Sequence, residues 1–245
     1  MTVQKPPVRV FRLVGPAILT LAAVSIFLGL GFWQLRRLAW KEALIAAIET
    51  RADAPAQPLP GISDWPNLRP DDYDYRHVTA RGFFENDKET LLFRPSGGAG
   101  LPEPGYHVLT PLRLNTGGYV IVNRGYVPPE RKDKQIRVAG LLSGEAIVTG
   151  LLRQPETRNL FTPPDDPAAA LYFTRDPVAI GKRFALAPLA PFTIDADDEP
   201  IPGGWPRGGT TIRQFPNNHL SYALTWFGLA LMLLAAVTIV AWKKN

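Results

Sequence analysis

Two stretches of the chain are almost purely apolar, and they lie near its opposite ends. The first covers residues 14–35 and the second covers residues 219–242. Each is at least as long as the roughly 20 residues that a helix needs to cross a hydrocarbon core about 30 Å thick. Neither contains Asp, Glu, Lys or Arg. The pattern predicts two transmembrane helices and therefore a lipid bilayer as the chain's surroundings.

The first apolar stretch has an alternative reading as a cleaved signal peptide. Signal peptides carry small residues before the cleavage site, whereas this run ends in GLGFWQLRR. Helical spacing continues from Trp33 into residues 36–51, where Arg37, Trp40 and Leu44 follow at intervals of three and four. We therefore expect an uncleaved anchor that leaves the membrane as an amphipathic extension, with Trp33 in the interfacial aromatic belt.

Between the two spans the pattern changes to short runs separated by proline and glycine. The proline-rich residues 52–74 are expected to form an extended linker. Alternating or apolar runs predict strands at 75–84, 90–94, 106–114, 119–125 and 145–153. We expect the first two to pair as a hairpin across ENDKE, and NTGG to make a tight turn between the next two.

Weaker signals complete the middle region. YFTR and FTID are short strand candidates, and Asp176 followed by Pro177 predicts the start of a short helix. The predicted fold class is thus a membrane protein of the α+β type, in which two transmembrane helices flank one compact antiparallel β-rich extramembrane domain at residues 75–215.

The net charge of +5 comes from the two ends of the chain. Residues 1–13 and 243–245 carry Lys and Arg without any acid, and the remaining 22 basic and 22 acidic residues balance. Short basic tails stay in the cytoplasm, whereas long loops cross the membrane regardless of charge. We expect both termini to be cytoplasmic and the middle domain to be periplasmic. The neutral middle domain indicates no nucleic-acid partner.

Composition also limits the chemistry. The chain has no cysteine, which excludes a disulfide framework and a thiol nucleophile, and both methionines lie outside the middle domain, which argues against copper(I) delivery. No nucleophile or phosphate-binding motif appears. The acidic DADDE run at 195–199 is a hard-cation candidate or, as we expect, a solvated loop. His77 and His107 are expected to be surface or half-buried strand residues.

His219 stands where a polar loop meets the second apolar stretch. The preceding asparagines suit helix capping, so His219 should lie in the first helical turn. The partial positive charge there disfavours imidazolium and leaves a neutral ring that can coordinate a metal. Tyr222, Ala223 and Trp226 follow at helical spacing and would form a slot for a flat ring. The alternative is an interfacial histidine among belt aromatics.

Several motifs occur in a fixed order between the two spans. They are Trp33-Gln34 with Arg37, Trp40 and Lys41; Tyr75-Arg76-x-Val78 with Gly82 and Phe84; Gly105-Tyr106-x-Val108-x-Thr110-Pro111-Leu112; Val122-Asn123-Arg124-Gly125-Tyr126-Val127-Pro128; Gly203-Gly204-Trp205-Pro206; and Asn217-Asn218-His219-Leu220-x-Tyr222-Ala223-x-Thr225-Trp226. In this order the chain resembles the Surfeit-locus-1 family of cytochrome c oxidase assembly factors. One departure is Tyr126, where the family usually has tryptophan.

The resemblance implies a multi-pass protein of the bacterial inner membrane that assists haem a insertion into oxidase subunit I, with haem a synthase as a further partner. A histidine in the position of His219 is the family's suspected haem ligand. Tyr222, Trp226 and Trp33 would pack on the ring, and Arg37 or Arg124 would meet the propionates. Arg124 has the alternative role of fixing a turn at a strand end. The N-terminal residues lack transit-peptide composition, which favours a bacterial member.

Two other functions are compatible with the same pattern. A haem-free scaffold would dock its spans against the oxidase, with small residues such as Gly29, Gly31, Ala223 and Gly228 allowing close helix contact. A membrane-tethered periplasmic hydrolase would need a base beside a hydroxyl, for which the sequence offers no motif. We expect no enzymatic activity.

Overall fold

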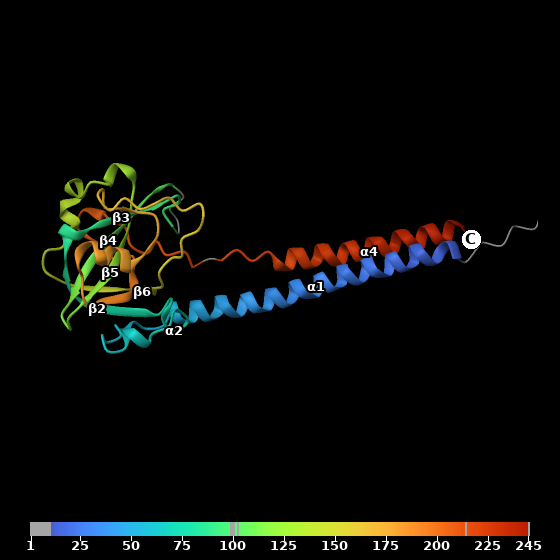
Figure 1. Ribbon diagram of the computed structural model, residues 1–245, viewed down its shortest axis with the longest axis horizontal. Coiled ribbons are helices and arrows are strands. Elements are labelled where there is room, and N and C mark those ends of the chain that lie inside the picture. The colour runs from blue at the N-terminus through green and yellow to red at the C-terminus, as the bar shows by residue number, and fades with distance from the viewer. Residues whose placement is uncertain (1–10, 99–100, 102, 214, 245) are drawn as a thin grey trace, which may run out of the picture. The chain divides into compact units, whose positions relative to one another are not determined.

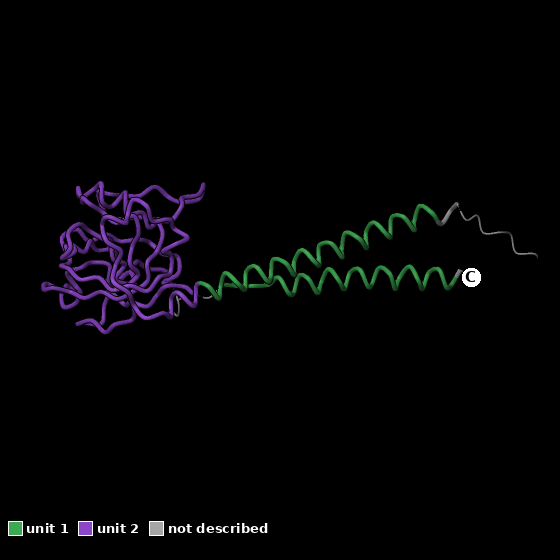
Figure 2. The backbone as a smooth tube through the Cα atoms, turned by 90° about the horizontal axis from the view of Figure 1, so that it is seen from below, with its two compact units in different colours: residues 1–47, 215–245 green, residues 48–214 purple. Residues whose placement is uncertain are grey.

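The computed structural model describes residues 11–98, 101, 103–213 and 215–244 (Figure 1). The chain forms two compact units, one made of residues 1–47 and 215–245 and the other of residues 48–214 (Figure 2). The expected cytoplasmic tail at 1–13 lies largely outside the described residues, as does Asn245 of the tail at 243–245. The first unit is helical and the second is β-rich, as the sequence predicts.

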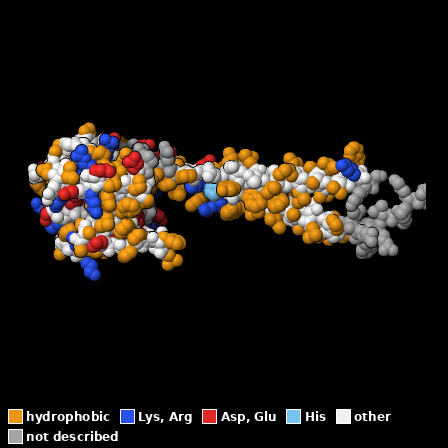
Figure 3. All heavy atoms as spheres, turned by 90° about the horizontal axis from the view of Figure 1, so that it is seen from above, with side chains coloured by type: hydrophobic (Ala, Val, Ile, Leu, Met, Phe, Trp, Pro, Cys, Tyr) orange, Lys and Arg blue, Asp and Glu red, His pale blue; other side chains and the backbone are white. Residues whose placement is uncertain are grey.

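The helical unit is built from two long helices. The first, α1 (Phe11–Ala52), continues without interruption through the predicted extension, and the second is α4 (His219–Lys244). Both are long and apolar enough to cross a membrane, with mean hydropathies of 2.0 and 2.3 over their most apolar windows, and only 11 % of each such window is buried. Hydrophobic side chains lie along both helices on the face that Figure 3 shows. A bilayer is the medium that such surfaces require.

The two helices pack along one narrow stripe each. On α1 the least exposed residues include Val24, Gly31 and Gln34, and on α4 they include Ala223 and Ala230. Spacings of three and seven residues place each set on one face. Small residues in these stripes let the backbones approach closely, as in other membrane helix pairs.

The described residues of the β unit form eight strands. They are β1 (Gln57–Pro58), β2 (His77–Phe84), β3 (Thr90–Arg94), β4 (Gly105–Leu114), β5 (Tyr119–Val127), β6 (Glu145–Arg153), β7 (Leu171–Tyr172) and β8 (Leu189–Ala196). Two short α-helices, α2 (Pro70–Tyr73) and α3 (Pro177–Phe184), and five short 3-10 segments join them. As the sequence predicts, α3 is capped by the Asp176 carboxylate, which accepts hydrogen bonds from the amides of Val178 and Ala179.

Five of the strands close into a barrel. Neighbouring strands follow the order β2-β6-β8-β5-β4, and β2 also pairs with β4 through Gly82–Phe84, which completes the ring. All pairs in this ring are antiparallel except β5 with β8. In chain order the barrel strands therefore have the 1-2-3-5-4 arrangement of an OB-fold, a five-stranded Greek-key barrel. β3 and β7 extend the sheet beyond β4, and β1 extends it beyond β2.

Side chains pack on both sides of the barrel wall. All five barrel strands contribute to the interior, and the residues in it include Val78, Leu112, Val122 and Phe192. On the outer side of β4 and β5, a second cluster with Ile180 lies beneath α3. Strand β5 is buried along nearly its whole length, because it has neighbours on both edges and packing on both faces.

The expected hairpin between residues 75–84 and 90–94 is wrong. Strand β3 pairs with β4 and β7 rather than with β2. The intervening residues form a 3-10 turn at Asn86–Lys88, not a two-residue hairpin turn. The two edges of β2 are already taken by β6 and β4, so barrel closure excludes β3 from β2.

Residues 52–74 are more structured than an extended linker. They contain β1, a 3-10 turn at Trp65–Asn67 and α2, and Trp65 and Tyr73 are 5 % and 2 % exposed. Both rings pack on Phe192 of β8. The prolines set the local backbone, but the two aromatic side chains draw the segment onto the barrel because burying each removes a large apolar area from water.

Candidate functional site

The loop before α4 places His219 at the very start of the helix. The His219 amide donates to the side-chain oxygen of Asn217 at 3.4 Å, and the Tyr222 amide donates to the Asn218 carbonyl at 3.2 Å. The first contact satisfies one of the amides that a helix N-terminus leaves free, and the second is the first hydrogen bond of the helix itself. The predicted capping by asparagine therefore fixes where His219 enters the membrane helix.

The imidazole of His219 is turned toward α1. Its Nδ1 lies 2.7 Å from Oε1 of Gln34, and the Gln34 side chain is buried, with 9 % of the residue exposed. An amide oxygen accepts hydrogen bonds and cannot donate them, so in this arrangement Nδ1 carries the proton. The lone pair of a neutral ring is then on Nε2, for which no partner is found among the described residues. In this orientation Nε2 is the ring nitrogen left free.

The two helices are in direct contact beyond this hydrogen bond. The ring of Phe27 stacks on Trp226 with centroids 5.8 Å apart, and Phe32 meets Phe227 edge-on at 5.4 Å. Ala223 is fully buried. The slot for a flat ring that the sequence suggested between the helices is thus filled by side chains, because aromatic residues at helical spacing pack on one another.

Four of the sequence-predicted site residues belong to the helical unit besides His219. Trp226 lies on the face of α4 that meets α1, whereas Tyr222 is 56 % exposed. Trp33 is 52 % exposed, and the Arg37 guanidinium lies 4.5 Å above the Trp40 ring. Tyr222 follows His219 by three residues and therefore points to one side of the stripe that holds Ala223 and Trp226. The structure joins His219 to Gln34, not to Trp33.

A cation follows Gln34 along the same face of α1. Lys41 Nζ donates to the carbonyl of Pro216 at 2.7 Å. This bond and the one between Gln34 and His219 hold both ends of the 216–219 turn against α1. The start of α4 is therefore a structured junction.

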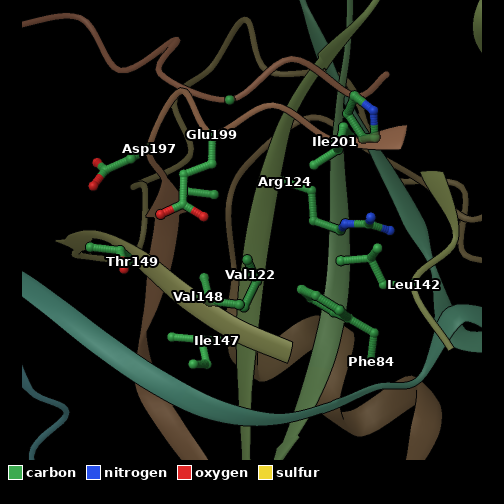
Figure 4. Close-up of a pocket in the computed structure, with 13 residues that line it drawn as sticks. Phe84, Val122, Arg124, Leu142, Ile147, Val148, Thr149, Asp197, Glu199 and Ile201 are labelled. Carbon is green, nitrogen blue, oxygen red and sulfur yellow. The ribbon is translucent and has the colours of Figure 1, made fainter. Parts of the chain in front are cut away.

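Arg124 lies in the β unit, at the end of the barrel interior. It follows Val122 by two residues on β5, so both side chains point to the inner side. The guanidinium stacks on Phe84 at 4.7 Å, donates to the Gly140 carbonyl and is 5 % exposed. A cavity of about 70 Å³ lies beside it, bordered by Glu199 (Figure 4).

The positive charge of Arg124 is not balanced by a nearby carboxylate among the described residues. Among the residues that the structure describes, no carboxylate lies within ion-pair distance of its guanidinium. Burial lowers the pKa of Arg124 to about 10, with Glu89 acting in the opposite direction. Arg124 thus fixes the Gly140 turn, which was one of its two predicted roles, and its propionate role stays a prediction.

The other two histidines have structural partners in the β unit. His77 lies between the Ala54 carbonyl at 2.9 Å and the Asp197 carboxylate at 2.7 Å. Burial opposes protonation of His77, but these two acceptors outweigh it and raise its pKa. His107 is 7 % exposed, and burial lowers its pKa. Within the described ranges, no group of three or more His, Cys, Asp or Glu residues is arranged to hold a metal ion.

The acidic run at 195–199 is not uniformly solvated. Asp195 is 5 % exposed and binds Arg175 through distances of 2.9 and 3.1 Å, with further hydrogen bonds from Asn123 and Thr211. Burial opposes ionisation of Asp195, but Arg175 and then Arg153 lower its pKa to about 2. The alternation of β8 places Asp195 on the outer side of the barrel wall, where these cations cover it.

Gln34 is the site residue that sequence reasoning missed as a contact. It occurs in the WQ motif, and it is a polar residue at the end of an otherwise apolar run. A polar side chain within a membrane helix usually faces another helix, because lipid offers it no hydrogen bond. That rule would have directed Gln34 toward α4.

Comparison with known proteins gives a consistent result. The profile of the SURF1 family matches residues 21–231. Surfeit locus protein 1 of Rattus norvegicus is 35 % identical over 213 residues, which cover 82 % of this chain and 67 % of the relative. The human protein of the same name is 34 % identical over 242 residues, or 93 % of this chain and 76 % of the relative. The match includes both the β barrel and the Gln34–His219 pair, and the chain belongs to the SURF1 family.

Proposed function

We propose that this protein is an assembly factor for haem-copper (cytochrome c) oxidase that assists the insertion of haem a into subunit I. Family membership supports the role in oxidase assembly. The observation that carries the haem-handling part is the 2.7 Å contact between His219 Nδ1 and Gln34 Oε1. It leaves Nε2 without a protein partner among the described residues, and an imidazole with its proton on Nδ1 is the form that would bind haem iron through Nε2.

Haem a is cargo in this proposal. His219 supplies one axial ligand, and Gln34 holds the ligand ring in its orientation by accepting the Nδ1 proton. Because Phe27, Trp226 and Ala223 fill the space between the helices, the porphyrin lies against the flank of the helix pair. The exposed aromatic surfaces of Tyr222 and Trp33 offer apolar area for such a flat ring.

The propionates of the cargo need cations near the membrane surface. Arg37 is the better candidate, because it follows Gln34 by one turn on α1 and is exposed. Arg124 is buried with its guanidinium bound to the Gly140 carbonyl, so a second acceptor would have to displace an existing contact. A haem held by one ligand on the exposed side of the helix pair can be released readily, which suits a carrier that passes its cargo on.

We further infer the cellular setting from charge and span. The protein is placed in the bacterial inner membrane with both termini cytoplasmic and the β unit periplasmic, because the basic excess lies in the two tails. Subunit I is the receiver of the haem and haem a synthase is its donor. No bond of the cargo is made or broken in this account, so the protein acts as a chaperone.

Complementation tests this function. In cells that lack the protein, His219→Ala should yield oxidase with reduced haem a content in subunit I, although the variant is present in the membrane at the parental level. Ser221→Ala is the matched control, since Ser221 is exposed two residues further along the same helix. Parental oxidase haem a content with His219→Ala would refute the ligand role.

A haem-free scaffold is the second candidate, and one observation favours it. Gly31 and Ala223 lie in the helix contact, whereas a side chain added at Gly29 or Gly228 would meet no atom within 4 Å. Gly29, which is exposed, and Gly228, which is half-buried, therefore leave shallow places where another membrane helix can approach. Under this alternative, Gly29→Leu and Gly228→Leu would stop oxidase assembly while His219→Ala would not.

A further inference from the structure

The loop between β6 and β7 presents two bulky apolar side chains to solvent. Leu160 is 99 % exposed and Phe161 is 93 % exposed, which is more than any other large hydrophobic residue in the described part of the chain. Single exposed apolar residues are ordinary in proteins. Two adjacent ones with almost no packing are different, because covering each would remove a large apolar area from water.

Their exposure does not result from a loose loop. Arg158 donates to the Asp165 carboxylate at 2.6 Å, to the Thr174 hydroxyl at 3.2 Å and to the Pro163 carbonyl. These bonds tie the two ends of segment 158–165, which we call the tip loop, to each other. The tip loop therefore holds Leu160 and Phe161 outward by a specific set of contacts.

The tip itself is uncharged and its backbone is largely satisfied. Residues 159–164 read NLFTPP. The Asn159 amide donates to the Thr162 hydroxyl, the Phe161 amide to the Asn159 side chain, and the Thr162 amide to the Asn159 carbonyl, at 3.0, 2.9 and 3.1 Å. The two prolines have no amide hydrogen to satisfy. Such a tip enters an apolar medium at low cost, because few free amides have to be desolvated.

A short connection joins the β unit to the membrane helix α4. Only residues 215–218 separate this unit from the start of α4, and so short a connection spans at most about 20 Å. The segment between β6 and β7, yellow to gold in Figure 1, projects from the end of the β unit at which the chain leaves toward residue 215. The tip loop and the membrane connection therefore share one end of the unit.

We propose that the tip loop inserts Leu160 and Phe161 into the interface of the bilayer and thereby forms a third membrane attachment of the chain. The occupant of this apolar tip is lipid. An aromatic and an aliphatic side chain on an uncharged tip have the composition of interfacial anchors. The paired Arg158 and Asp165 remain at the headgroup level, where water can reach them. The inference rests on the two membrane helices and is independent of haem binding.

Site-directed spin labelling of the whole chain tests this attachment. The chain has no cysteine, so Leu160→Cys and Phe161→Cys give single labelling sites. Val138→Cys is the control, because Val138 is also apolar and 60 % exposed but lies in the 3-10 segment Lys134–Gly140. Each labelled protein is reconstituted in phosphatidylcholine–phosphatidylglycerol vesicles. Collision rates are measured with oxygen, which concentrates in lipid, and with a water-soluble nickel chelate.

The expected result is an oxygen-to-nickel collision ratio several-fold higher at 160 and 161 than at 138. In a Phe161→Ser background the ratio at 160 should fall toward the control, because half of the anchor is gone. Equal ratios at all three positions in vesicles would overturn the proposal. A rise at 160 that appears only after a purified membrane protein is added would also overturn it, since the occupant would then be a protein pocket. Labelling at 93–99 % exposed positions leaves the fold intact.

Discussion

The side-chain oxygen of Gln34 lies 2.7 Å from Nδ1 of His219 and joins two helices whose residues are 185 positions apart in the sequence. The bond does two things at once. It satisfies a polar side chain that would otherwise face lipid, and it determines which imidazole nitrogen is free. A stability role and a ligand role are therefore connected through one contact, and variants of Gln34 separate them.

Replacing Gln34 should weaken haem retention without removing the ligand. Gln34→Leu deletes the acceptor for the Nδ1 proton, and loss of such supporting partners typically costs about 10- to 100-fold in metal affinity. Gln34→Glu keeps an acceptor oxygen and should retain most of the binding. The measurement is haem a bound per protein after co-expression with haem a synthesis. Equal retention by Gln34→Leu and the parent would show that the hydrogen bond serves helix packing alone.

Adding bulk at Gly31 should separate the two helices. A Cβ at this position would lie 2.5 Å from the Phe227 ring, so Gly31→Val overpacks the contact, and such changes cost about 1–3 kcal/mol. Gly29→Val is the matched control, because a Cβ there meets no atom within 4 Å. Unfolding of the helical unit in mixed detergent micelles, followed by tryptophan fluorescence, should shift only for Gly31→Val. A shift of the same size in both variants would contradict the observed packing.

The Asp195–Arg175 pair should dominate the acid stability of the β unit. The folded-state pKa of Asp195 is about 2, below its ordinary value of 3.8. The ionised form therefore stabilises the fold above pH of about 4, and this contribution is lost as the pH falls toward 2. Asp195→Asn removes the closer of the two carboxylates that pair with the buried Arg175, the other being Glu156 at 3.3 Å, and breaking such a buried pair costs up to about 3–5 kcal/mol. Denaturant unfolding at pH 7 measures this cost, with the exposed Asp198→Asn as the near-neutral control.

The contact of His77 with Asp197 and the Ala54 carbonyl should weaken as the pH rises above neutrality. The pKa of His77 is raised by Asp197 and the Ala54 carbonyl, so the charged ring stabilises the fold at pH below about 6.5, and this stabilisation disappears as the pH rises through the folded-state pKa. Amide hydrogen exchange in residues 52–57 should accordingly be faster, after correction for intrinsic rates, at pH 8 than at pH 6. His77→Gln should remove this difference. A corrected difference that persists in the variant would assign it to another group.

Much of the architecture follows from local patterns in the sequence. Long apolar runs identify the spans, and alternation with NTGG identifies β4 and β5. The pairing of β3 could not be predicted in this way, because it depends on β2 having both edges occupied in the closed barrel. The burial of Trp65 and Tyr73 likewise depends on Phe192, which lies more than a hundred residues away.

The candidate site shows the same division. The position of His219 at the start of a helix follows from Asn217 and Asn218, which act within a few residues. Its partner could not be inferred from the second apolar stretch, because the rotation of α1 against α4 decides that Gln34 rather than Trp33 faces the ring. Helical spacing alone also predicted that Tyr222 and Trp226 share one face of the helix. In the structure Trp226 packs on Phe27 of α1, whereas Tyr222 is exposed.

The central claim is that His219 is an axial ligand of haem a, and the visible absorption spectrum of the purified protein tests it most directly. The protein is co-expressed with haem a synthesis and isolated in mild detergent. The account predicts haem a bands from the parental chain and from Ser221→Ala, and loss of these bands from His219→Ala at equal protein concentration. Bands of parental position and intensity in His219→Ala would contradict it.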